Sequence, residues 1–191
     1  MTTKNKQDHP LINEESIAVL VPGMLMSAKA LIEFGSSEWK KEDPEALVPG
    51  TITSSIIISG HCAELLLKYK IKREGRTFKN THDLYNLYRK LKMESKEKIQ
   101  KEFDKLKSAS EIALGEGWDS TEAIFQKARN ASVNWRFVNK KSLTCDHRAL
   151  YIAAVSVYKT TPFASKTYSR QEVKDPALKA SVFGGLGRTT R

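Results

Sequence analysis

Apolar residues recur at intervals of three and four along most of the chain, which is the period of amphipathic helices. From Asn13 to about Phe34 the recurring residues are Ile17, Leu20, Val21, Met24, Leu25, Ala28, Leu31 and Ile32. Pro22 and Gly23 interrupt this pattern, so the helix is either kinked there or begins again with Pro22 in its first turn. A loop is predicted from Gly35 to Gly50, where Ser, Pro and Gly cluster.

The segment from about Thr51 to Glu74 is the most apolar helix that the pattern predicts. It carries two adjacent stripes at helical spacing. These are Ile52, Ile56, Gly60, Ala63, Leu67 and Ile71 in one, and Ile58, Cys62, Leu65 and Tyr69 in the other. A helix that is apolar on most of its circumference belongs in the middle of a bundle rather than at its edge. We therefore predict that this helix is the axis of the fold.

Shorter amphipathic helices are predicted in the second half of the chain. Their approximate ranges are 82–91, 95–114, 120–138 and 146–159. Thr81 is the predicted N-cap of the first, and Asp119 or Ser120 that of the third. The pattern thus predicts an all-α protein, an up-and-down helical bundle of about five to six helices.

The two ends of the chain lack the apolar residues that a core requires. Residues 1–11 are predicted to be disordered, and residues 161–191 to form a basic, flexible tail around one helical domain at 12–160. No uninterrupted apolar run reaches the roughly 18–20 residues of a membrane span, and the N-terminus does not resemble a secretory signal. These patterns predict a cytoplasmic protein that does not enter the membrane.

Cys62 and Cys145 are the two cysteines, and their distance in the sequence gives neither a disulfide framework nor metal-ligand spacing. No metal and no cofactor is predicted. The formal net charge is +10. From Lys68 to Lys107, fourteen Lys and Arg residues face six Asp and Glu, which fits an acidic partner such as nucleic acid. Alternatively, the Lys-rich stretch is only a solvated helix face.

His61, Glu64 and Lys68 fall on one face of the predicted central helix. As a functional site, they would hold a metal or perform acid–base chemistry. As structure, a carboxylate in so apolar a helix needs a buried cation, which Arg129 or Arg136 would supply. We favour this polar core of Glu64, His61 and Arg136, because structural ion pairs often resemble functional sites.

His82 and Asp83 also form a candidate catalytic pair. They lie where a helix is predicted to begin, and an acidic side chain there caps free backbone amides and favours the positive end of the helix dipole. We therefore predict that this pair has a capping role.

Three sequence blocks together resemble the HEPN superfamily of helical-bundle domains. They are GHCAELLLKYKIKREG (60–75), THDLYNLYRKL (81–91) and NWRFV (134–138). The resemblance covers about residues 50–160. It implies a helical bundle that tends to dimerise and that serves prokaryotic toxin–antitoxin, phage-defence or RNA-processing systems.

The ribonucleases of this superfamily carry an Arg, a polar residue, three further residues and a His. Here the stretch runs from Arg129 to Asn134, and the final His is absent. An Asn amide does not transfer protons near neutral pH as imidazole does. A second alignment places the signature at Trp135-Arg136-Phe137 instead, and the sequence leaves both alignments open.

Three functions follow as hypotheses. The first is a catalytically degenerate HEPN-like module that binds RNA or a partner protein as a homodimer. The second is a metal-independent endoribonuclease that uses Arg129 and Asn134. The third is a small helical adaptor whose basic surface binds an acidic protein. The candidate nucleic-acid-binding residues are Lys68, Lys72, Arg73, Arg76, Lys79, Arg129 and Arg136.

Overall fold

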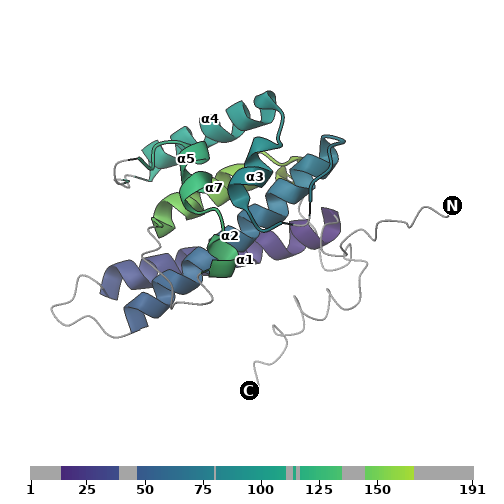
Figure 1. Cartoon of the computed structure of the whole chain (residues 1–191). Coiled ribbons are helices and arrows are strands. Elements are labelled where there is room, and N and C mark those ends of the chain that lie inside the picture. The colour runs from purple at the N-terminus through teal and green to yellow at the C-terminus, as the bar shows by residue number, and fades with distance from the viewer. Residues whose placement is uncertain are drawn as a thin grey trace, which may run out of the picture.

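The computed structural model describes residues 14–38, 47–79, 81–110, 114, 117–134 and 145–165 (Figure 1). Every regular element in these ranges is a helix, so the predicted all-α fold is confirmed. The elements are α1 (Glu14–Glu38), α2 (Leu47–Arg73), α3 (Leu84–Arg89), α4 (Met93–Ala109), α5 (Thr121–Lys127), α6 (Ala131–Asn134), α7 (His147–Lys159) and the 3-10 turn η1 (Pro162–Ser165).

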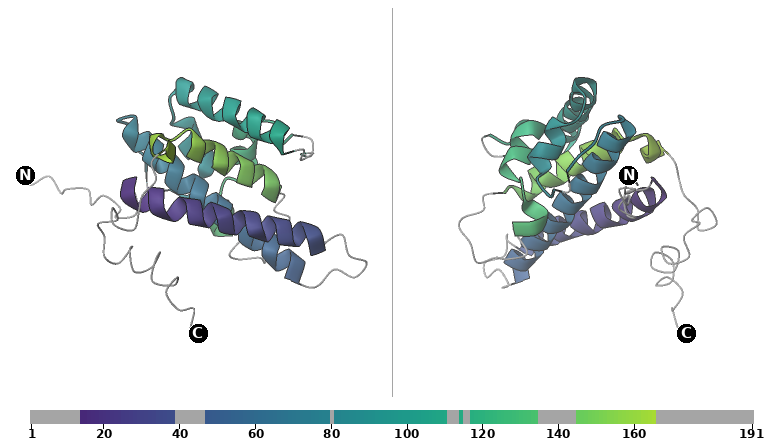
Figure 2. Two further views of the ribbon diagram at one scale, coloured as in Figure 1. Left: turned by 180° about the vertical axis from the view of Figure 1, so that it is seen from behind. Right: turned by 45° about the vertical axis from the view of Figure 1, so that its right-hand side comes forward.

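Helix α2 is the axis of the bundle. It packs against α1, α3, α6 and α7. Its ten residues from Cys62 to Ile71 are all buried, including three that carry charged side chains. Figures 1 and 2 show α1 and α4 on opposite sides of the molecule, with α2 and α7 between them. The predicted central position of this helix agrees with its burial.

Helix α1 continues through Pro22, which lies inside its range. One face of α1 is buried against the rest of the bundle through Ile17, Val21, Leu25, Ala28 and Ile32. This unbroken stripe holds the helix together across the proline, which removes one backbone hydrogen-bond donor. The helix ends at Glu38, beyond the predicted Phe34.

Gly35 lies where α1 and α2 approach closely. A Cβ atom at Gly35 would lie 3.0 Å from Thr51 Oγ1. Such a separation is tighter than most contacts of a Cβ atom, so a larger residue would require the Thr51 side chain or the helix to shift by a few tenths of an ångström. The absence of a side chain at Gly35 thus accommodates the close approach of α1 to the first turns of α2.

The start of α3 differs from the prediction. Asp83, not Thr81, is the N-cap: its Oδ1 accepts a hydrogen bond of 2.9 Å from the Asn86 amide. Thr81 stabilises the segment just before the helix, since its hydroxyl oxygen accepts a hydrogen bond of 3.1 Å from the Asp83 amide. Asp83 therefore has the capping role that its position at the helix start indicates.

The helix predicted over 120–138 is divided. Ser120 caps α5, which ends at Lys127, and a turn at 128–130 separates it from α6. In this turn the Arg129 carbonyl accepts a hydrogen bond of 2.7 Å from the Leu84 amide, so it is used between elements rather than within a helix. Residues 135–138 lie outside the described ranges.

The chain remains packed beyond residue 160, where the tail was predicted to begin. Thr161 and Phe163 are buried. The Phe163 ring lies 5.1 Å from that of Tyr69 and 5.9 Å from that of Tyr158, measured between centroids. The aromatic contacts of Phe163 thus join η1 to α2 and α7 and extend the packed part of the chain to the end of η1.

Two helices are long and apolar enough to cross a membrane when judged by length and composition alone. They span Glu14–Ser37 and Pro49–Arg73, with mean hydropathies of 1.7 and 1.2. The prediction of no such helix was based on the length of uninterrupted apolar runs, whereas the mean hydropathy over an 18-residue window tolerates a few polar residues. In the second, 56% of the window is buried in the fold, the setting of a core helix.

Candidate functional site

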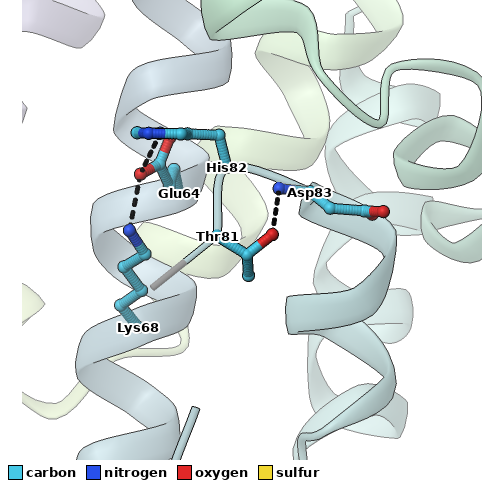
Figure 3. A network of polar contacts seen from close by, with 5 residues as sticks. All are labelled: Glu64, Lys68, Thr81, His82 and Asp83. Carbon is cyan, nitrogen blue, oxygen red and sulfur yellow. Dashed lines mark hydrogen bonds and ion pairs between the residues drawn. The ribbon is translucent and has the colours of Figure 1, made fainter. Parts of the chain in front are cut away.

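A buried carboxylate on α2 is the centre of the main polar cluster (Figure 3). Glu64 is only 3% exposed, and its Oε1 lies 2.7 Å from Lys68 Nζ, one helical turn further on. His82 approaches from the segment before α3, with Nδ1 at 3.0 and 3.1 Å from the two carboxylate oxygens. Because a carboxylate only accepts hydrogen bonds, His82 Nδ1 carries the proton and donates it.

The surroundings of Glu64 favour its charged form. Burial raises the pKa of the carboxyl, but the hydrogen bonds from Lys68 and His82, together with their charges, outweigh burial and hold the pKa below its ordinary value. Lys68 is itself 5% exposed, so the two opposite charges are buried together. The cluster therefore joins α2 to the start of α3 through a polar contact inside the core.

Asp83 faces away from Glu64 and binds a different cation (Figure 3). Its Oδ2 accepts hydrogen bonds from Arg129 Nη2 at 2.6 Å and Nε at 3.0 Å. Burial raises the pKa of the Asp83 carboxyl. The hydrogen bonds and charge of Arg129, together with the backbone amides of α3, lower it by more, so the pKa lies below its ordinary value. Together with the Leu84–Arg129 backbone bond, this pair fixes the turn after α5 against the start of α3.

This arrangement differs from the predicted one. The cation beside Glu64 is Lys68 from the same helix, whereas Arg129 is engaged by Asp83. Arg129 lies in the turn between α5 and α6 rather than within the helix predicted over 120–138. Arg136 and the side chain of Asn134 lie outside the described residues, and so does any contact between Arg136 and Glu64.

An exposed aromatic–cation group adjoins the Asp83–Arg129 pair. The half-buried Tyr85 ring has the guanidinium carbons of both Arg89 and Arg129 at 5.7 Å from its centroid. Nearby, Arg76 donates a hydrogen bond of 2.7 Å to the Lys90 carbonyl, which holds the loop after α2 against the end of α3. Cations from three parts of the chain thus gather along α3.

The structure separates the predicted nucleic-acid-binding residues into two groups. Lys72, Arg73, Arg76 and Lys79 are exposed, as such a role requires. Lys68 is buried in its ion pair with Glu64 and is not available to a phosphate, so its assignment to that group is wrong. Among the aromatic residues near them, Tyr69 and Tyr88 are buried, whereas Phe78 and Tyr85 are partly exposed.

His61 is half-buried one turn before Glu64 on α2. Within the described ranges, no three His, Cys, Asp or Glu side chains are grouped closely enough to bind a metal ion. Cys62 is a free, fully buried thiol, and burial raises its pKa to about 12. The thiol therefore behaves as a small apolar side chain rather than as a nucleophile or a ligand.

Sequence reasoning missed Lys70, a second buried lysine on α2. It is 7% exposed, and its ammonium donates a hydrogen bond of 2.8 Å to the Thr160 carbonyl beyond α7. Burial lowers its pKa to about 8, against an upward effect from Glu74 and a further lowering by Lys98. Its place between Tyr69 and Ile71, both in apolar stripes, was the available signal.

We expect Lys70→Met to change the pH dependence of stability. A lysine whose folded pKa is lowered to about 8 destabilises the fold while it is charged in both states. The unfolded chain binds the additional proton between about pH 8 and 10.4, so wild-type stability should rise relative to the variant across this window, by about 2–3 kcal/mol. Urea unfolding of both proteins at pH 7 and pH 10 measures the difference. Lys101→Met, at an exposed position of α4, should show no such relative change.

Comparison with known proteins gives one match. The family model described as HEPN domain matches residues 46–129. No curated protein and no solved structure matches the chain. The matched range contains α2 to α5, the Glu64–Lys68–His82 cluster and the Asp83–Arg129 pair. The match supports the HEPN resemblance, and its range contains two of the three sequence blocks, 60–75 and 81–91.

Proposed function

We propose that this protein is a non-cleaving HEPN module that binds single-stranded RNA in a prokaryotic defence or toxin–antitoxin setting. The carrying observation is a group of exposed cations at α3, which we call the α3 cation cluster: Arg89 and Arg129 lie over Tyr85, Arg76 is bound to the end of α3, and Lys79 is exposed in the segment between α2 and α3. Phosphate-binding cations beside an accessible aromatic ring suit single strands, whose bases are free to stack.

The charges in this cluster are poorly balanced by protein carboxylates. Within the described residues, no Asp or Glu oxygen lies within 4.0 Å of a side-chain nitrogen of Arg76, Lys79 or Arg89. By contrast, Lys98 and Lys105 on α4 have Glu94 and Glu102 as partners. Cations without a protein counterion release solvent counterions when they bind phosphate, and this release drives association.

The absence of cleavage is supported by the residues of the family's catalytic stretch. In the alignment that begins at Arg129, Asn134 stands where a histidine would transfer protons, and an amide does not perform that step near neutral pH. Arg129, the first residue of the stretch, is engaged by Asp83 through two hydrogen bonds of 2.6 and 3.0 Å. The guanidinium thereby holds the turn after α5, while the Arg129 side chain as a whole remains 48% exposed.

Incubation of the purified chain with labelled single-stranded RNA, without added metal, tests the proposal. We expect retardation on native gels that weakens steeply with salt, and no new fragments on denaturing gels. Cleavage that disappears in Arg129→Ala would favour a metal-independent ribonuclease instead. If no retardation occurs even at low salt, the basic surface binds something other than RNA, as in an adaptor for an acidic protein.

A further inference from the structure

His82 presents a fixed imidazole at the surface, beside the buried polar cluster (Figure 3). Its Nδ1 donates to the two oxygens of Glu64, at 3.0 and 3.1 Å, and Lys68 holds the same carboxylate at 2.7 Å. The Glu64 side chain is 3% exposed, whereas that of His82 is 58% exposed. The imidazole is therefore anchored through one nitrogen from inside the fold, while much of the side chain remains open to solvent.

The second nitrogen of this ring has a defined hydrogen-bonding character. When a neutral imidazole carries its proton on Nδ1, Nε2 has a lone pair and accepts a hydrogen bond. Within the described ranges, the hydrogen bonds of the His82 ring are those of Nδ1 to Glu64, and none involves Nε2. These bonds restrict the ring before any ligand arrives, which lowers the entropy cost of binding. His82 thus offers an oriented and unused acceptor.

The cations near His82 do not supply such an acceptor. Lysine and arginine side chains only donate hydrogen bonds, and the phosphates that they contact are common to RNA and DNA. The 2′-hydroxyl distinguishes ribose from deoxyribose, and it can donate to a ring nitrogen. A carboxylate would also accept this bond, but its charge would repel the neighbouring phosphates. A neutral imidazole reads the sugar without that repulsion.

Two observations place His82 at the edge of the α3 cation cluster. Asp83, the next residue, binds Arg129 at 2.6 Å, and adjacent Cα atoms are about 3.8 Å apart. In addition, Lys68 Nζ lies 5.9 Å from the centroid of the partly exposed Phe78 ring, so Phe78 and His82 border the same ion pair. A cation for phosphate, an acceptor for ribose and a ring for base stacking thus come from neighbouring positions.

We propose that Nε2 of His82 accepts a hydrogen bond from a ribose 2′-hydroxyl of the bound strand and thereby makes this surface selective for RNA over DNA. The inference rests on the proposed function and identifies the group that recognises the sugar. Glu64 is a positioning residue in this arrangement, because it holds the proton of the imidazole on Nδ1 and fixes the direction of Nε2.

Fluorescence anisotropy of the full chain with single strands of one sequence tests the ribose contact, at pH 8 to favour neutral imidazole. We expect RNA to bind about three- to tenfold more tightly than DNA, the usual net contribution of one hydrogen bond. A 2′-fluoro strand keeps the sugar pucker of RNA but has no hydroxyl hydrogen, so it should bind as weakly as DNA. Equal affinity of the wild type for RNA and for either other strand would overturn the proposal.

The variant His82→Asn separates the two nitrogens of the ring. The asparagine amide nitrogen takes the place of Nδ1 and can still donate to Glu64, whereas the acceptor at Nε2 is lost. We expect this variant to keep a melting temperature close to that of the wild type and to bind the three strands alike. A preference for RNA that survives in His82→Asn would assign the selectivity to another group.

Lys79→Met is the matched control, since a phosphate contact is common to the three strands. It should weaken binding of all three by the same factor and leave the preference for RNA unchanged. Loss of the preference in Lys79→Met would contradict the assignment to His82. If the wild type retained none of the strands even at low salt, the proposed function would fail and this inference with it, whereas equal retention of RNA and DNA would remove the ribose contact alone.

Discussion

Replacement of Lys68 by Met should lower the free energy of unfolding by about 3–5 kcal/mol, because the Glu64 carboxylate would remain buried without its nearest cation. Both side chains are at most 6% exposed, so water reaches neither to replace the lost partner. Met keeps much of the aliphatic volume of Lys, which limits any packing defect. Urea unfolding followed by circular dichroism at pH 7 measures the loss. Lys101→Met, on the exposed face of α4, should cost little.

The pH dependence of this loss identifies its origin. Since Lys68 and His82 hold the pKa of Glu64 below its ordinary value, the pair stabilises the fold above the unfolded-state pKa of about 4. This contribution disappears as the pH falls through the folded pKa, so wild type and Lys68→Met should converge in acid. The double variant Glu64→Met/Lys68→Met should recover much of the stability. If Lys68→Met were no more costly than Lys101→Met, the buried pair would not have the importance assigned to it.

Charge reversal in the α3 cation cluster should reduce affinity for single-stranded RNA by at least about a hundredfold at moderate salt. The variant changes Arg76, Lys79 and Arg89 to Glu and leaves Arg129 in its bond with Asp83. Three lost phosphate contacts would also make the slope of log affinity against log salt about 2 units less steep, at about 0.7 per contact for single strands. Fluorescence anisotropy across a salt series measures both quantities.

A variant of equal charge provides the control. Changing Lys98, Lys101 and Lys105 to Glu on α4 alters the net charge by the same amount, at positions that the structure leaves exposed. We expect this α4 variant to retain most of the affinity and of the salt dependence. Equal losses in the two variants would show that net charge, rather than the α3 cation cluster, governs binding.

The sequence predicted the core better than the polar contacts. The two stripes on α2 were sufficient to identify its central place, because burial follows the helical period of apolar residues. The partner of Glu64 was not predictable in this way, since the choice between Lys68 and Arg129 depends on where the turn after α5 lies. That turn is set by a bond between the Arg129 carbonyl and the Leu84 amide, and two residues 45 positions apart leave no periodic signal.

The polar face of α2 shows the same limit. Its lysines appeared in the sequence as one basic stretch, although Lys68 and Lys70 are buried and Lys72 is exposed. The three lysines differ in exposure because different elements pack over each turn of α2. A count of charges in the sequence does not reveal this packing. Similarly, α1 carried a regular apolar pattern, but only the packing revealed that part of it faces outward.

The position of α2 has a consequence for where an independently folding unit begins and ends. The family signature occupies residues 46–129, yet α1 and α7, which cover much of the apolar surface of α2, lie outside that range. A fragment cut at the signature boundaries would expose that surface to water at a cost proportional to its area. The range that matches the family model and the minimum length of polypeptide that folds therefore differ in this protein. Expression of a shortened form should retain the chain from α1 through Phe163.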